Sequence, residues 1–159
     1  MLPGMSASKI TGALALGTLL ALSAGSGCRT PPRGAPPAIE FRLAHNKPAP
    51  GCKARRLPGG AQMVYVEPTP VLTGRDILSA STVESLGDYG LMLVFTPTAS
   101  ARLAEVTGRF VGERLALFVD GKLRSAPLIR EQITSGRAAV FGDFTRSEAE
   151  ALARRLQRR

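Results

Sequence analysis

The fold is decided by the stretch Val111-Gly112-Glu113-Arg114-Leu115-Ala116-Leu117-Phe118-Val119-Asp120-Gly121-Lys122-Leu123-Arg124-Ser125-Ala126-Pro127. Residues 115–119 are apolar at odd and even positions alike, a pattern typical of a central strand that is covered on both faces. Asp120-Gly121 then predicts a tight hairpin turn, because both central residues of such a turn need positive φ. The returning segment 122–126 is more polar and stops at Pro127, which cannot donate to a neighbouring strand. These features predict a hairpin whose second strand lies near a sheet edge.

Two helices are predicted on either side of this hairpin. Thr96-Pro97 begins the first, because threonine caps a helix and proline at the first position loses no hydrogen bond. Gly112 is expected at its C′ position. Thr145 and Glu148 fit a capping box at the start of the second, worth about 1 kcal/mol. The buried stripes recur at helical spacing and comprise Ala99, Leu103, Val106 and Phe110, then Ala149, Leu152 and Leu156.

The remaining strands are predicted from short apolar patterns at 39–43, 63–66, 82–86, 91–95 and 138–141. Glu67-Pro68-Thr69-Pro70 is expected to bend the chain, since its prolines disfavour a central strand. Thr73-Gly74-Arg75-Asp76 is expected to form a turn in which Gly74 takes positive φ and which leads into a short helical turn through Ala80. The order of elements predicts an α+β fold, a mixed or antiparallel sheet with two helices packed on one face.

Further small anchors flank the hairpin in a defined order. They are Leu72-Thr73-Gly74-Arg75-Asp76-Ile77, Ala80, Val94-Phe95-Thr96, Thr107, Ile133, Gly136, Gly142-Asp143-Phe144-Thr145 and Glu148-Ala149. Together with the hairpin they resemble the periplasmic P1 head subdomain of the SecD protein-export membrane protein, over roughly residues 39–156. Most are turn and packing residues, so the resemblance implies a fold more than an activity. The turn and motif positions that we single out are Gly74, Gly112, Asp120, Gly121, Pro127, Gly136 and Gly142.

Residues 1–27 predict an export signal peptide. Lys9 precedes an apolar run, 10–24, that is too short to span a bilayer comfortably. Small residues then lead to Cys28, which resembles a bacterial lipobox, although Gly25 stands where leucine is usual. We therefore expect Cys28 to be lipidated after cleavage. Plain cleavage with secretion, and an uncleaved anchor, are the alternatives.

Residues 28–38 are rich in proline and read as an extended tether to a domain at 39–157. Cys52 is an unpaired thiol if Cys28 is lipidated, and the two could close a disulfide if it is not. The sequence leaves both possibilities open. No segment after the leader is long and apolar enough to span a membrane, whereas the SecD family carries its head domain on a protein with several membrane spans.

The formal net charge of +9 points to an anionic partner or simply to a basic, well-solvated surface. Nucleic acid is not expected as a partner. The arginines are scattered, aromatic residues are not interleaved with them, and the leader directs the chain out of the cytoplasm.

No catalytic constellation is visible, so neither an enzyme nor a cofactor is expected. His45 is the only histidine, and no Cys, His or Asp spacing around it suggests a metal site. There is no nucleophile elbow and no phosphate-binding loop. Asp120 is better explained as a turn residue than as a catalytic acid.

The resemblance implies a non-enzymatic, membrane-anchored periplasmic module that contacts unfolded or translocating polypeptides or the Sec export apparatus. Such contact could use a groove beside the sheet, or strand addition along 122–126. A shared fold does not secure a shared function. The alternative is an envelope lipoprotein domain of the same fold that binds an anionic surface or another envelope protein and is unrelated to export.

Overall fold

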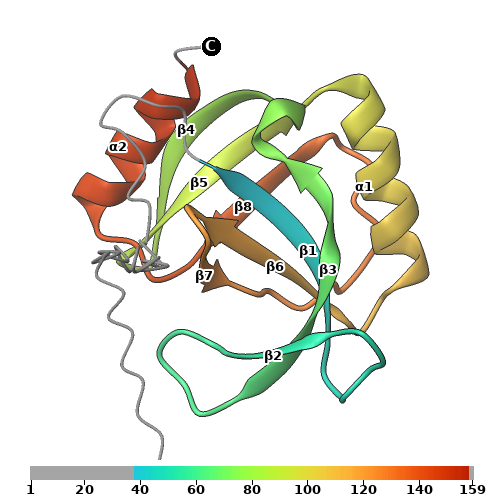
Figure 1. The fold of residues 1–159 in the computed structure, drawn as a ribbon. Helices are drawn as coiled ribbons and strands as arrows, with labels where there is room; N and C mark the ends of the chain where they lie inside the picture. Colours follow the sequence, from blue (N-terminus) through green and yellow to red (C-terminus); the bar gives the residue numbers. More distant parts are fainter. Residues whose placement is uncertain (1–37, 158–159) are drawn as a thin grey trace, which may run out of the picture. The chain divides into compact units, whose positions relative to one another are not determined.

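Eight strands and two helices make up residues 38–157, the part of the chain that this computed structural model describes (Figure 1). The strands are β1 (Ile39–His45), β2 (Lys53–Arg56), β3 (Met63–Thr73), β4 (Ile77–Ser85), β5 (Asp88–Phe95), β6 (Arg114–Val119), β7 (Lys122–Ser125) and β8 (Arg137–Phe141). The helices are α1 (Pro97–Arg109) and α2 (Arg146–Gln157), and a 3-10 turn lies at Gly74–Asp76.

The strands pair antiparallel and divide between two sheets. The order is β2-β3-β1-β6-β7 in the five-stranded sheet and β4-β5-β8 in the three-stranded sheet. Segments far apart in the chain meet in the larger sheet, where Ile39 of β1 lies opposite Val119 of β6. The predicted α+β class is therefore confirmed, and the structure adds the division into two sheets.

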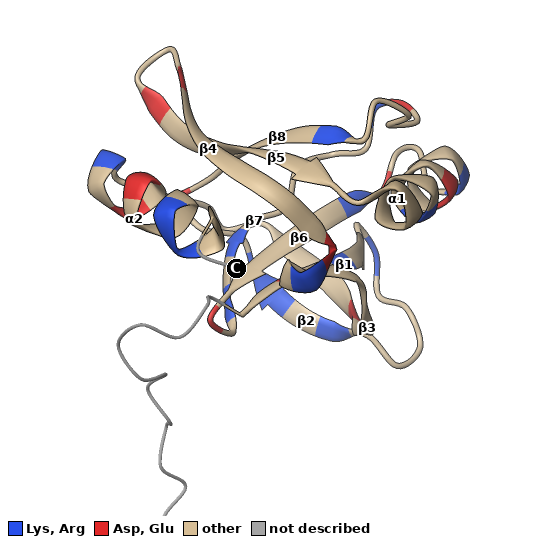
Figure 2. Ribbon diagram, turned by 90° about the horizontal axis from the view of Figure 1, so that it is seen from above, with Lys and Arg blue, Asp and Glu red and all other residues tan. Residues whose placement is uncertain are grey.

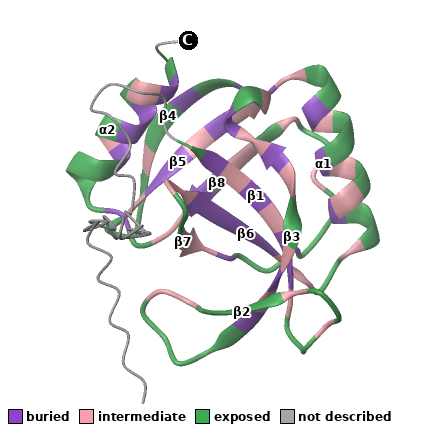
Figure 3. Ribbon diagram, in the orientation of Figure 1, coloured by how far each residue is buried: buried purple, intermediate pink, exposed green. Residues whose placement is uncertain are grey.

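The main core lies between the two sheets and is closed on opposite sides by α1 and α2 (Figure 3). Leu103 of α1 and Leu152 of α2 pack in it with Phe41, Leu93 and Leu117 from the strands. Both helices thus bury side chains in the core on one face of the five-stranded sheet, a core to which the three-stranded sheet also contributes.

β6 contributes to a second core on the opposite face of its sheet. Leu115 and Leu117 belong to the main core, whereas Ala116 and Phe118 belong to the second core. All four residues are at most 7% exposed. The prediction that this strand is central and covered on both faces is confirmed.

Both helices begin where the capping residues predict. The Thr96 side chain accepts a hydrogen bond from the Ala99 amide at 3.2 Å, with Pro97 in the first turn. The first helix ends at Arg109 with Phe110 as its cap, so the C′ residue is Val111 and Gly112 lies one residue beyond it, not at the C′ position that was predicted. There it has φ 92° in the turn that leads into β6.

β3 continues through the segment where a bend was predicted. β2 pairs only with residues 63–66 of β3, so the following residues have β1 on one side and no strand on the other among residues 38–157. Pro68 and Pro70 are tolerated because a proline on an open edge withholds no hydrogen bond from a neighbour. Register shifts around Arg42 of β1 accommodate the irregular backbone. The segment is thus not part of a central strand, as its prolines predict, and an irregularity in register lies there, but it does not interrupt β3.

The short helical turn after β3 is smaller than predicted. Gly74 is buried at its first position without positive φ, and the Asp76 carboxylate accepts from the Thr73 amide at 2.7 Å. The turn ends at Asp76 and does not reach Ala80, which pairs with Leu93 in the three-stranded sheet. Strand pairing and burial of Ala80 outweigh continuation of the helical turn.

The turn between β4 and β5 is also tighter than predicted. Leu86 and Gly87, at φ 54° and 87°, form a two-residue connection in place of the four-residue loop expected at 87–90. Leucine rarely adopts positive φ, so Gly87 is the only residue of this pair that signals the turn in the sequence. The Leu86 side chain is fully exposed.

The hairpin between β6 and β7 has the turn that Asp-Gly predicts, with Asp120 at φ 49° and Gly121 at φ 78°. We expect Gly121→Val to lower the free energy of unfolding by about 1 to 3 kcal/mol, because a β-branched residue resists positive φ. The control is Gly60→Val, at an exposed glycine without positive φ. Equal urea midpoints for the two variants would contradict the assignment.

Candidate functional site

An apolar groove with a volume of about 240 Å³ opens from the main core beside β8 and the connection that follows β7. Its floor is made by core side chains and its rim by the connection. The lining residues are Phe41, Phe95, Leu103, Leu115, Pro127, Leu128, Ile129, Arg130, Glu131, Ile133, Ala138, Ala139 and Val140. Such a concave, mostly apolar surface can bind the apolar groups of a ligand.

The backbone of the connection is held firmly along the start of β6. The Leu115 amide donates to the Pro127 carbonyl at 3.0 Å, and the Ile129 amide donates to the Glu113 carbonyl at 2.8 Å. Ile129 is buried, whereas Leu128 between these two bonds is 43% exposed at the mouth of the groove. The arrangement presents one apolar side chain on a fixed backbone.

Helix α1 fixes the far part of the same connection. The buried Thr107 hydroxyl donates to the Leu103 carbonyl at 2.7 Å and accepts from the Ile133 amide at 2.9 Å. The Gln132 side chain donates to the Ala104 carbonyl at 3.1 Å. These bonds hold the groove wall against the helix, so the cavity is formed before any ligand binds.

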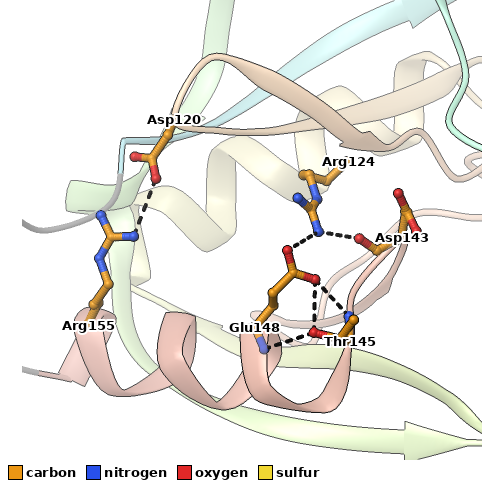
Figure 4. Close-up of polar contacts among 6 residues, drawn as sticks. All are labelled: Asp120, Arg124, Asp143, Thr145, Glu148 and Arg155. Atoms are coloured by element: carbon orange, nitrogen blue, oxygen red, sulfur yellow. Dashed lines mark hydrogen bonds and ion pairs between the residues drawn. The ribbon is translucent and has the colours of Figure 1, made fainter. Parts of the chain in front are cut away.

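The outer edge of β7 is covered where strand addition was considered (Figure 4). The Asp143 amide donates to the Arg124 carbonyl at 3.3 Å, and the Ser125 hydroxyl donates to the Phe141 carbonyl. At Gly142 a Cβ would lie 2.7 Å from the Arg124 carbonyl, so glycine permits this close approach. The connection between β8 and α2 therefore occupies the edge, and strand addition there is not supported.

The Arg124 guanidinium stabilises the same junction. It lies over the Phe144 ring at 4.7 Å and donates to the Asp143 carbonyl and, at 3.3 Å, to the Glu148 carboxylate (Figure 4). Glu148 also accepts from the Thr145 amide at 2.9 Å, as the predicted capping box requires. Chiefly through this backbone hydrogen bond, with the Thr145 hydroxyl and Arg124 assisting, the pKa of Glu148 is held below its usual value.

Asp120 acts as a clamp as well as a turn residue. Its carboxylate accepts from the Ala38 amide at 3.0 Å and from the Arg155 guanidinium of α2 at 3.3 Å. The turn of the hairpin therefore holds both the start of β1 and the last helix, which accounts for this aspartate without a catalytic role.

Only Pro127 among the singled-out positions lines the apolar groove. Gly136, at φ 66°, lies in the turn before β8.

Cys28 and the leader lie outside the described residues. Cys52 forms no disulfide within residues 38–157, and burial raises the pKa of its thiol. Leu128 was not predicted as a site residue, because its only signal in the sequence is its place in an apolar pair after a proline.

His45 is part of a polar cluster at the end of a strand. It is the last residue of β1, and its ring nitrogens lie 3.0 Å from Glu67 and 3.5 Å from Glu113. Within the described range, no group of three His, Cys, Asp or Glu residues is arranged to hold a metal ion.

A family model described as the P1 head subdomain of SecDF matches residues 52–158. The chain belongs to this family. The protein translocase subunit SecD of Magnetococcus marinus is 38% identical over 86 residues, which cover 52% of this chain and 16% of that protein. SecDF of Thermus thermophilus is 39% identical over 85 residues, which cover 53% of this chain and 12% of that protein. The P1 head chain thus spans less than a fifth of these relatives.

Solved SecDF structures share the fold. A crystal structure of SecDF in a super-membrane-facing form matches with a TM-score of 0.62 at 28% identity, covering 78% of this chain and 19% of that one. A second structure, from a study of SecDF as a membrane component that enhances protein export, matches with a TM-score of 0.61 at 27% identity. The match covers 78% of this chain and 63% of that one. The resemblance to the P1 head is confirmed. In the described part of this chain, no helix has the length and apolar character needed to cross a membrane.

The capping box of α2 should make stability depend on pH. Because the folded pKa of Glu148 is lowered from 4.5, its stabilisation is present at neutral pH and is lost as the pH falls below 4.5 through the lowered value. We expect Glu148→Ala to cost about 1 kcal/mol at pH 7 and progressively less in acid, by urea unfolding at each pH. Glu131→Ala, at an exposed position, is the control. A cost that does not change with pH would contradict this role.

Proposed function

We propose that this P1 head domain binds unfolded or translocating polypeptides as a non-enzymatic module of protein export, and that the apolar groove receives their apolar side chains. The observation that carries the proposal is Leu128, exposed on a fixed backbone above a groove of about 240 Å³. The family to which the chain belongs supports polypeptide as the ligand class, since the relatives are named protein translocase subunits.

The size and chemistry of the groove favour weak binding with little sequence preference. Burying one leucine or phenylalanine side chain contributes about 1.5 to 3 kcal/mol, which alone gives low affinity. An apolar wall also makes few demands on the identity of the side chain that it receives. Because α1 and β6 already fix the connection, binding spends little free energy on ordering the protein.

We expect Leu128→Ser to weaken binding of a labelled unfolded exported protein about three- to tenfold, because an exposed apolar contact is lost. The chain from Arg29 onward would be titrated by fluorescence anisotropy at low and moderate salt. Leu86→Ser is the matched control, since Leu86 is an exposed leucine at the β4–β5 turn and does not line the groove. Equal affinity of both variants, or no binding by the unaltered chain at any salt, would contradict the proposal.

We further propose that the domain works in the periplasm, attached to a membrane through a lipid on Cys28. The leader and the small residues before Cys28 support this. Mass spectrometry of the mature amino terminus should show an acylated Cys28, and Cys28→Ser should release the protein from the membrane fraction. An unmodified Cys28, or cleavage at another position, would contradict the anchor.

Components of the Sec translocase are the second proposed class of partner, supported by the names of the relatives. Crosslinking in intact cells followed by retrieval of the chain would test it. The net charge of +9 favours one alternative, an envelope domain that binds an anionic surface. Binding that vanishes at moderate salt and is matched by any polyanion would favour this alternative.

A further inference from the structure

β2 lies in a stretch of the chain that carries positive charge and no acidic residue. Between Glu40 and Glu67 the cationic residues are Arg42, Lys47, Lys53, Arg55 and Arg56. Figure 2 shows the basic residues of β2 on the side of the domain away from the acidic residues near the β4–β5 turn. Three of these cations, Lys53, Arg55 and Arg56, lie on the four-residue strand β2.

Lys53 and Arg55 line a second groove, of about 290 Å³, on the face of the five-stranded sheet that holds the second core. They alternate along β2, so their side chains project to the same side of the strand. Phe118 and Val66 supply apolar surface in this groove. The remaining lining residues are Glu40, Arg42, Glu67, Pro68 and Gly121.

In the described part of the chain, the acidic residues of this groove already have charged or hydrogen-bonding side-chain partners, whereas Lys53 and Arg55 of β2 have no carboxylate partner; the Arg55 guanidinium donates only to the neighbouring Ala54 carbonyl, at 3.2 Å. Glu40 pairs with Arg42 at 2.7 Å, and Glu67 pairs with His45 at 3.0 Å. Within residues 38–157, no carboxylate lies within ion-pair distance of Lys53 or Arg55. An incoming carboxylate would therefore meet uncompensated positive charge.

β2 also provides backbone groups for pairing. It is the end strand of its sheet, all four of its residues are exposed, and it pairs with β3 on one side. On its other side no strand lies among the described residues, in contrast to the covered edge of β7. Lysines and arginines on such an edge discourage pairing with neutral or basic strands. The same charges are complementary to an acidic strand.

We propose that β2 binds acidic, extended polypeptide segments by strand addition. The segment pairs with the open edge of β2 and places carboxylates at alternate positions near Lys53 and Arg55. An anionic membrane or polyanion would use the charge but not the strand edge. The inference rests on the proposed function only for the ligand class, polypeptide, and it assigns acidic segments to a site separate from the apolar groove.

The test uses the full chain in phosphatidylcholine nanodiscs and a labelled octapeptide of alternating glutamate and valine. We expect the double variant Lys53→Gln/Arg55→Gln to weaken binding about three- to tenfold, from the loss of two exposed ion pairs. The control double variant Arg109→Gln/Arg146→Gln removes the same charge from the helices and should change affinity less than about twofold. The same peptide with alternate backbone amides N-methylated should bind at least about tenfold more weakly, because its ladder hydrogen bonds are blocked.

The inference would be overturned if the two double variants bound the peptide with equal affinity. It would also be overturned if the N-methylated peptide bound as tightly as the unmodified one. Binding to phosphatidylglycerol vesicles without binding to the peptide would overturn it too. Leu128→Ser should leave octapeptide binding unchanged. If this variant instead lost octapeptide binding, the peptide would lie in the apolar groove, and the inference would be overturned while the proposed function would stand. Conversely, octapeptide binding that depends on Lys53 and Arg55 would support the inference even if Leu128→Ser left binding of unfolded proteins unchanged.

Discussion

Burial of β6 on both faces is the constraint on which the other elements depend. Leu115 and Leu117 require cover from the helices and the three-stranded sheet, while Phe118 requires cover on the opposite face. Because the backbone of a buried strand must also be paired, β1 and β7 flank it on either side. The segment 127–129 then follows the start of β6, and this position makes it the wall of the apolar groove.

The elements that sequence reasoning predicted correctly carry their signals among near neighbours. The Asp120-Gly121 turn and the Thr145 cap are examples, because a few adjacent residues decide their backbone conformation. The path of β3 through Pro68 could not be predicted, since proline is tolerated there only because β2 stops pairing at Val66. A groove beside the sheet was considered from the sequence, but its location and lining could not be predicted for a similar reason: the exposure of Leu128 follows from contacts with residues distant in the sequence.

The two proposed binding surfaces make different physical demands on a polypeptide. The apolar groove opens from the main core and removes apolar surface from water, a contribution that salt weakens little. The groove beside β2 lies against the second core on the other face of the sheet and depends on charges that salt screens. A chain with apolar and acidic stretches could engage both, so that two weak contacts reinforce one another when the spacing permits.

The clamp formed by Asp120 determines how the domain can be joined to other sequences. One carboxylate receives the amide of Ala38, where the described domain begins, and the guanidinium of Arg155, two residues before it ends. The first residue of the described domain and the last turn of α2 are therefore tied to the same side chain, a geometry that permits insertion into a loop of a larger protein.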